Sequence, residues 1–138
     1  MSTDHQQYST DNQRDKIREY AAKPEPFFLY TAFTAPHWPL HALPEDIEKY
    51  KGRYRGGWDQ LRAERHARQV KMGIVDRKWP LTPRDPNVPA WEDEKHQDWQ
   101  ARRMAVYAAQ IDRLDRGIGR MLDALKTAGA EENTLILF

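Results

Sequence analysis

Apolar residues recur with a helical period towards the C-terminus of this chain. Between residues 92 and 128 they return at intervals of three, four and seven positions, which is the spacing of one face of an α-helix. The stripe consists of Met104, Tyr107, Ala108, Ile111, Leu114, Ile118, Met121, Leu122 and Leu125. The charged residues of this stretch fall mainly off the stripe. The pattern predicts one long amphipathic helix, stopped by Gly129, whose apolar face contributes to a core.

Two short runs, residues 27–33 and 134–138, are apolar without the helical period. The first is rich in aromatic residues and is bounded by Pro26 and Pro36, which favours a strand over a helix. Its lack of alternation is typical of a parallel strand that is covered on both faces. The order of strand, long helical stretch and strand predicts an α/β fold in which two parallel strands are joined by a long helical crossover.

Shorter elements are predicted between these runs. Residue types favoured at helix N-caps predict a helix over about residues 9–22, and a proline at the first helical position predicts a short helix over residues 44–50. A charged helix with few apolar residues is expected over residues 58–72. Residues 74–90 contain a proline at every third position, which excludes a regular helix. We favour a loop packed on its own domain over a polyproline ligand for a partner.

Composition narrows the class of protein. The chain has 138 residues, of which 39% are hydrophobic and 31% charged, so it is long enough to bury a core and has a polar surface. Its 22 Lys and Arg against 21 Asp and Glu give a net charge of +1, which argues against a nucleic-acid or membrane partner. The polar first residues do not match a signal peptide. There is no cysteine, which excludes disulfides, thiolate metal sites and cysteine nucleophiles.

The candidate functional residue is His37, which follows the first predicted strand. Ligands of open α/β sheets bind beyond the carboxyl ends of strands, and Pro36 and Pro39 stiffen the loop that carries the imidazole. Histidine can bind an anion or act as a general acid near neutral pH. The alternative is a structural histidine that donates to a backbone carbonyl. Trp38 either lines a ligand pocket or anchors the loop, and both interpretations stay open.

Two further pairs of residues resemble sites, and we interpret neither pair as one. His41 follows His37 by four residues, the spacing of a zinc-binding pair on a helix, but the intervening prolines prevent a helix there. Asp112 and Asp115 form a carboxylate pair on the arginine-rich long helix. We interpret them as salt-bridged scaffold residues rather than as a catalytic pair.

The same stretches resemble a known family. Residues 27–30 and 35–42 are similar to the central segment of the sulfatases, specifically the bacterial arylsulfatases. The likeness continues through residues 49–54, 57–59, 81–85 and 99–138, and residues 8–11 are similar to the lead-in of the family. The resemblance implies a partial alkaline-phosphatase-like sulfatase domain. It implies hydrolysis of a sulfate ester, with His37 as a catalytic residue that lines the sulfate pocket and contacts the substrate. Trp38 is the second candidate for contact with the substrate, beside its alternative role as a loop anchor.

The resemblance also implies cofactors whose residues the chain lacks. Sulfatases use a formylglycine nucleophile, made from Cys or Ser in a Cys/Ser-x-Pro-x-Arg motif, and a divalent metal, usually calcium. The serines are Ser2 and Ser9, and neither begins such a motif. In the family the second strand leads into an Asp-Asn-Gly segment that binds the metal, and no such segment occurs here.

We therefore expect residues 1–138 to be a fragment of a single sulfatase catalytic domain, inactive alone, without the nucleophile region and the metal-binding region. Its expected partners are a small sulfate ester in the parent enzyme and the remainder of the sulfatase domain. One alternative is a non-catalytic helical interaction module that presents the proline-rich loop and tryptophans to a partner. Another is a fragment of a related phosphoesterase or phosphonate hydrolase. The sequence leaves a cytoplasmic and a periplasmic parent equally open.

Overall fold

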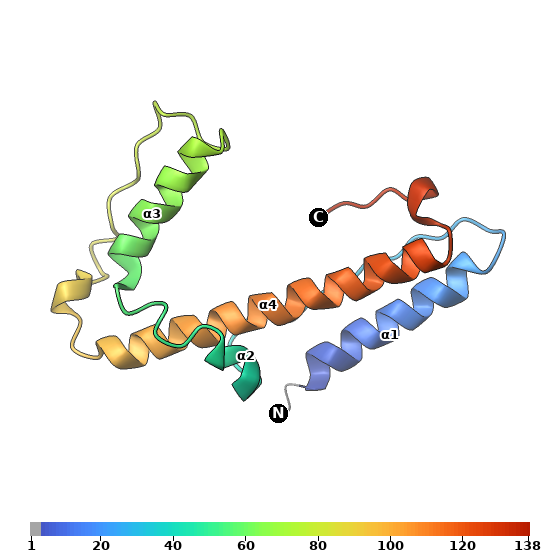
Figure 1. Cartoon of the computed structure of the whole chain (residues 1–138), viewed down its shortest axis with the longest axis horizontal. Helices are drawn as coiled ribbons and strands as arrows, with labels where there is room; N and C mark the ends of the chain where they lie inside the picture. Colours follow the sequence, from blue (N-terminus) through green and yellow to red (C-terminus); the bar gives the residue numbers. More distant parts are fainter. Residues whose placement is uncertain (1–3) are drawn as a thin grey trace.

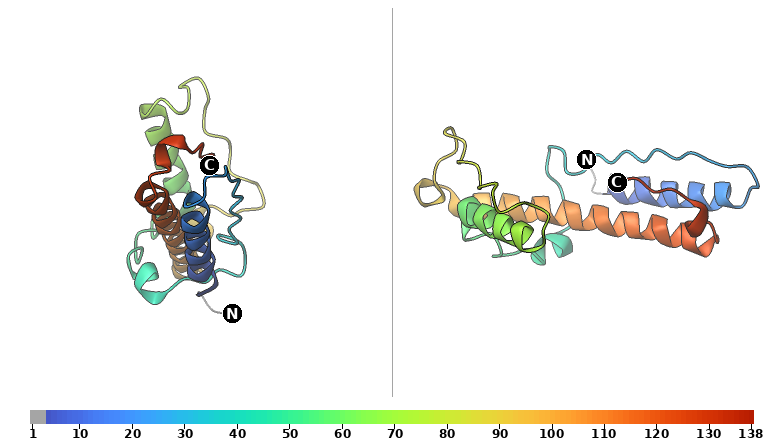
Figure 2. Two further views of the ribbon diagram at one scale, coloured as in Figure 1. Left: turned by 90° about the vertical axis from the view of Figure 1, so that its right-hand side faces the viewer. Right: turned by 90° about the horizontal axis from the view of Figure 1, so that it is seen from above.

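The computed structural model describes residues 4–138, and the regular structure in this range is entirely helical (Figure 1). Helix α4 (Gln97–Thr127) runs the length of the molecule. Helix α1 (Asp4–Ala21) lies beside its C-terminal half and runs in the same direction, and α2 (Pro44–Glu48) lies against its middle (Figure 2). Helix α3 (Gly57–Lys71) projects away from the N-terminal half of α4. Short 3₁₀ turns occupy Trp91–Asp93 and Glu131–Asn133.

The core lies between α1 and α4. Ile17 of α1 is 2% exposed and packs with Ala124 and Leu125 of α4. Seven residues earlier on each helix, a Cβ added at Gly117 would lie 2.6 Å from the Cγ2 atom of Thr10. The two backbones can approach this closely only because Gly117 has no side chain, so this glycine allows a close contact between α1 and α4.

The long helix and the helices over 44–50 and 58–72 were predicted within a few residues, whereas α1 begins five residues before its predicted start. The loop over residues 74–90 packs on its own domain, as we favoured. Arg62 of α3 donates to the carbonyl of Thr82 at 2.8 Å, and the Nε2 of His66 lies 2.9 Å from the carbonyl oxygen of Trp79. These bonds hold the irregular loop against α3.

The predicted first strand is wrong. Residues 27–33 are irregular, and no backbone hydrogen bond pairs them with another segment of the described chain. Phe27 and Leu29 pack against the α1–α4 core, whereas Phe28 and Tyr30 are 89% and 78% exposed. The segment therefore buries one side on two helices instead of both sides in a sheet, so its aromatic content does not make it a strand.

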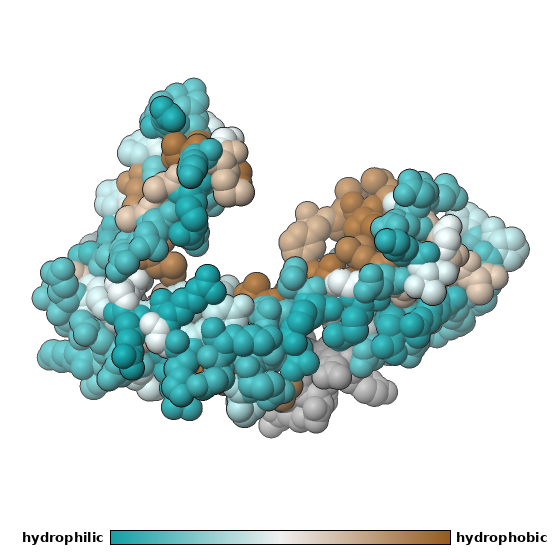
Figure 3. All heavy atoms as spheres, viewed as in Figure 1, coloured by the Kyte–Doolittle hydropathy of each residue, from teal (hydrophilic) through white to brown (hydrophobic). Residues whose placement is uncertain are grey.

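The predicted second strand is also wrong, and with it the α/β fold class. Residues 134–138 form no regular structure, and Leu135, Leu137 and Phe138 are at least 84% exposed. Figure 3 shows hydrophobic residues gathered around this tail. A strand requires a hydrogen-bonded neighbour, and the described residues provide none for either run. Over residues 4–138, α4 connects two irregular segments and is not a crossover between parallel strands.

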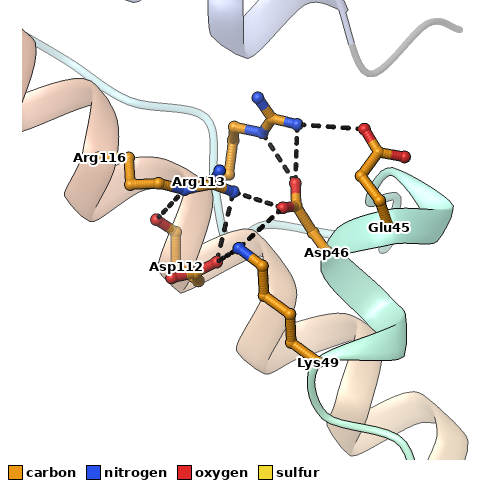
Figure 4. Close-up of polar contacts among 6 residues, drawn as sticks. All are labelled: Glu45, Asp46, Lys49, Asp112, Arg113 and Arg116. Atoms are coloured by element: carbon orange, nitrogen blue, oxygen red, sulfur yellow. Dashed lines mark hydrogen bonds and ion pairs between the residues drawn. The ribbon is translucent and has the colours of Figure 1, made fainter.

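A buried aspartate joins α2 to α4 (Figure 4). Asp46 of α2 is 1% exposed, and its carboxylate accepts hydrogen bonds from Arg113, at 2.8 Å, and from Arg116. Lys49, one turn further along α2, lies 3.3 Å from Asp46 and 2.9 Å from Asp112. Asp112 also pairs with Arg116 at 3.3 Å, so this carboxylate belongs to the scaffold. Charge-assisted hydrogen bonds from two arginines to the two oxygens of one carboxylate fix its orientation as well as its distance.

The arginines decide the charge state of Asp46. Burial alone would raise the pKa of its carboxyl group, but the hydrogen bond from Arg116 and the positive charges of Arg113 and Arg116 outweigh burial and hold the pKa below the ordinary value of an aspartate. A lowered pKa in the folded state means that the ionised carboxylate stabilises the fold above the ordinary carboxyl range. This contribution is lost as the pH falls through the folded-state pKa.

Replacing Asp46 by Asn should therefore destabilise the chain strongly near neutral pH. The amide removes the buried negative charge that Arg113 and Arg116 share, and loss of one partner of a buried ion pair costs about 3 kcal/mol. Urea unfolding followed by circular dichroism at pH 7 measures this difference. The difference between wild type and variant should shrink as the pH falls from the ordinary carboxyl pKa through the lowered folded-state pKa of Asp46, below which the wild-type carboxylate is neutralised too.

The control for this experiment is Asp112→Asn. Asp112 takes part in the same cluster but is 24% exposed, so its loss should cost no more than about 1 kcal/mol. Equal stability of wild type and Asp46→Asn at pH 7 would contradict the role that we assign to the buried carboxylate.

Candidate functional site

The candidate site is the His37 loop, residues 35–41, between the extended segment and α2. The backbone N–H of His37 donates to the carbonyl of Thr34 at 2.9 Å, which closes a tight turn. The imidazole Nδ1 lies 2.7 Å from the carbonyl oxygen of Trp38. A carbonyl oxygen can only accept, so Nδ1 carries the hydrogen and Nε2 is left for a ligand. The ring itself is exposed.

This hydrogen bond is the one that the structural interpretation of His37 predicted. It is compatible with a functional role, because a bond at Nδ1 fixes the tautomer and limits rotation of the ring. The free Nε2 accepts a proton when the ring is neutral and donates one when it is charged. The loop therefore presents one oriented nitrogen to solvent.

Trp38 is held on α4 by an arginine that the sequence did not single out. The guanidinium of Arg103 lies 4.8 Å from the centroid of the Trp38 ring and 4.5 Å from that of Trp99. Its Nη1 also donates to the side chain of Gln100 at 2.9 Å. Cation–π contacts of this geometry stabilise by about 0.5–1 kcal/mol each at exposed sites. Arg103 thus anchors the residue next to His37.

The other sequence candidates do not join His37. His41 is exposed, and no group of three or more His, Asp or Glu residues that could hold a metal ion occurs in residues 4–138. Asp46 and Asp112 do lie close together, but Lys49 and two arginines neutralise them. These carboxylates do not fit a calcium site. A chain without cysteine, and without a serine in the required motif, does not fit a formylglycine either.

Within the described residues 4–138, no helix combines the length and apolar character needed to cross a membrane.

The chain belongs to the sulfatase family, because the family model of sulfatases matches residues 2–138. This match confirms the family resemblance that the motifs around His37 indicated. It covers nearly the whole chain, including the His37 loop and α4.

Individual relatives agree with this assignment. An uncharacterized sulfatase of Schizosaccharomyces pombe is 41% identical over 119 residues, which cover 84% of this chain and 22% of the relative. An arylsulfatase of Klebsiella aerogenes is 39% identical over 118 residues, which cover 84% of this chain and 25% of the relative. The chain thus spans about a quarter of the length of these relatives.

Replacing Arg103 by Ala should loosen the His37 loop. Loss of two cation–π contacts should cost about 1–2 kcal/mol and should shift the resonances of the Trp38 indole and the His37 ring. Nuclear magnetic resonance of the chain, compared with wild type, measures both. Arg102→Ala is the matched control, because Arg102 is the neighbouring arginine of α4 and stacks on no ring in the described structure. Unchanged Trp38 and His37 signals in Arg103→Ala would refute the anchoring role.

Proposed function

We propose that this chain is part of a sulfuric-ester hydrolase and that its His37 loop forms one wall of a pocket for a sulfate ester. Membership of the sulfatase family supports the class of reaction. The observation that carries the role of His37 is the 2.7 Å bond from its Nδ1 to the carbonyl of Trp38, because it leaves Nε2 oriented and unblocked. The substrate class is a small sulfate ester.

In this proposal, His37 acts at the oxygen that leaves the sulfur. The charged imidazole donates its Nε2 proton to that oxygen, or holds the negative sulfate group by a charge-assisted hydrogen bond. The exposed face of Trp38 offers an apolar surface for an aromatic ester. Neither the attacking nucleophile nor the calcium ligands of the family fit residues of this chain, so we assign both to the rest of the parent polypeptide.

The 138 residues alone should not hydrolyse an aryl sulfate above the rate of a His37→Ala variant. In the longer polypeptide encoded by the native gene, His37→Ala should lower kcat/KM for an aryl sulfate by roughly a hundredfold or more, as expected for loss of a general acid. Steady-state kinetics over a range of pH measures this loss. If His37 donates a proton, the wild-type activity should fall as the pH rises and the imidazolium loses its proton, and this alkaline limb should disappear in the variant.

His41→Ala is the control in the same loop, because His41 is exposed and lies four residues further on. It should leave kcat/KM nearly unchanged. A His37→Ala enzyme with full activity would refute the pocket role. Turnover by the isolated chain would refute our assignment of the nucleophile and the calcium ligands to the rest of the parent polypeptide.

A second candidate function rests on the exposed apolar residues. If the chain is a non-catalytic helical interaction module, its outward aromatic residues Phe28 and Tyr30 and its apolar tail form a surface for a partner. The module would fold cooperatively and remain monodisperse by itself. A segment of a larger domain would instead associate through these residues, because exposed apolar patches drive aggregation.

We expect the isolated chain to associate with itself at micromolar concentrations. The double variant Phe28→Ser and Tyr30→Ser should reduce this association without changing helicity, because both side chains point away from the core. Light scattering after size-exclusion chromatography measures the mass. Phe27→Ser is the matched control, because Phe27 packs on the core and its loss should lower stability by about 3 kcal/mol. A monodisperse wild-type chain with one sharp unfolding transition would favour the module instead.

A further inference from the structure

A concave site lies on the N-terminal part of α4. It has a volume of about 380 Å³ and is formed by the end of α2, the turn that follows α2, and the first turns of α4. Its floor is apolar and includes Ile47, Ala101 and Ala105, of which both alanines are buried. No residue of the His37 loop lines it. We call it the Arg55–Arg102 cleft, after the two arginines at its rim.

The charges at the rim do not balance. Lys51 and Glu48 pair with each other at 2.7 Å and cancel. This leaves Arg55 and Arg102 against Asp98, which is one excess positive charge. Neither guanidinium has a hydrogen bond or an ion pair with any residue of the described range 4–138. By contrast, Arg113 and Arg116 on the same long helix are both paired.

The walls of the cleft are fixed by one buried tryptophan. Trp91 is 8% exposed, and its indole N–H donates to the carbonyl of Arg55 at 3.1 Å. Its own carbonyl accepts from the side chain of Gln97 in the first turn of α4 at 2.7 Å. A Cβ added at Gly57, which has a φ of +76°, would lie 2.0 Å from the Trp91 ring, so turn and indole are in close contact. Both rims of the cleft are therefore tied to the same residue.

We propose that the Arg55–Arg102 cleft binds an organic monoanion, with its apolar body on the floor and its oxyanion group between the two guanidiniums. Guanidinium groups match the geometry of sulfate, carboxylate and phosphate oxygens, and an apolar floor adds affinity for a ring or a short chain. One excess positive charge suits a single anionic group. Asp98 opposes the ligand and limits its charge. The proposal does not depend on the role of His37.

The test uses small probes that separate the two parts of the ligand. We expect 4-methylphenyl sulfate and 4-methylbenzoate to bind to the chain, with chemical-shift changes at Ala101 and Ala105. Inorganic sulfate and 4-methylphenol, which carry only the anion or only the apolar body, should bind at least about tenfold more weakly. The comparison of the first two probes distinguishes a sulfate-ester site from a general oxyanion site. Affinity should fall as salt is added.

Substitutions with opposite expected signs sharpen the test. Arg55→Ala and Arg102→Ala should each weaken binding about three- to tenfold, whereas Asp98→Asn should strengthen it about two- to fivefold. Arg65→Ala, at an exposed arginine of α3 outside the cleft, and His37→Ala should leave the affinity unchanged. Circular dichroism identifies a variant that has lost its helices. If an arginine variant has unfolded, the affinity of Asp98→Asn tests the proposal instead.

The proposal is wrong under any of four results. The first is no shift at Ala101 and Ala105 with either probe. The second is inorganic sulfate binding as tightly as 4-methylphenyl sulfate. The third is Asp98→Asn with unchanged or weaker affinity, because a binding anion must gain from removal of a nearby carboxylate. The fourth is a loss of probe binding in His37→Ala, because the probe would then bind at the His37 loop and not in the cleft.

Discussion

The carboxylate of Asp46, held between two guanidinium groups, fixes α2 against α4. Helix α2 has five residues, too few to be stable by itself, so its position comes from this contact with α4. The His37 loop ends at α2, and the turn that lines the Arg55–Arg102 cleft begins there. One buried charge therefore defines where the two candidate sites lie on a single long helix.

The helices were predictable because their signals are local. The period of the α4 stripe, the proline at the start of α2 and the glycine after α3 each mark an element from neighbouring residues alone. The predicted sheet was wrong, because strands lack such a local signal. A strand depends on a partner at a distance, and residues 27–33 have their core contacts on two helices rather than on a neighbouring strand. Aromatic content led us to expect burial on both faces, whereas Phe28 and Tyr30 are exposed and only Phe27 and Leu29 pack on the core.

The candidate site shows a similar division. His37 could be selected from its prolines and its family motif, and its role stays a prediction. Its anchor, Arg103, could not be selected, because it lies 65 positions beyond Trp38 and off the apolar stripe. The same holds for Asp46, because its two arginine partners lie 67 and 70 positions further along the chain. Contacts of an arginine with a ring or a carboxylate far away in the sequence leave no periodic signal.

The contact between Gly57 and Trp91 has a consequence for how this region can vary. A side chain at position 57 would occupy the space of the indole, and a smaller residue at position 91 would leave a hole and remove the donor to the carbonyl of Arg55. The residue types at positions 57 and 91 are therefore coupled. Across related chains they should change together or not at all, even though 34 positions separate them in the sequence.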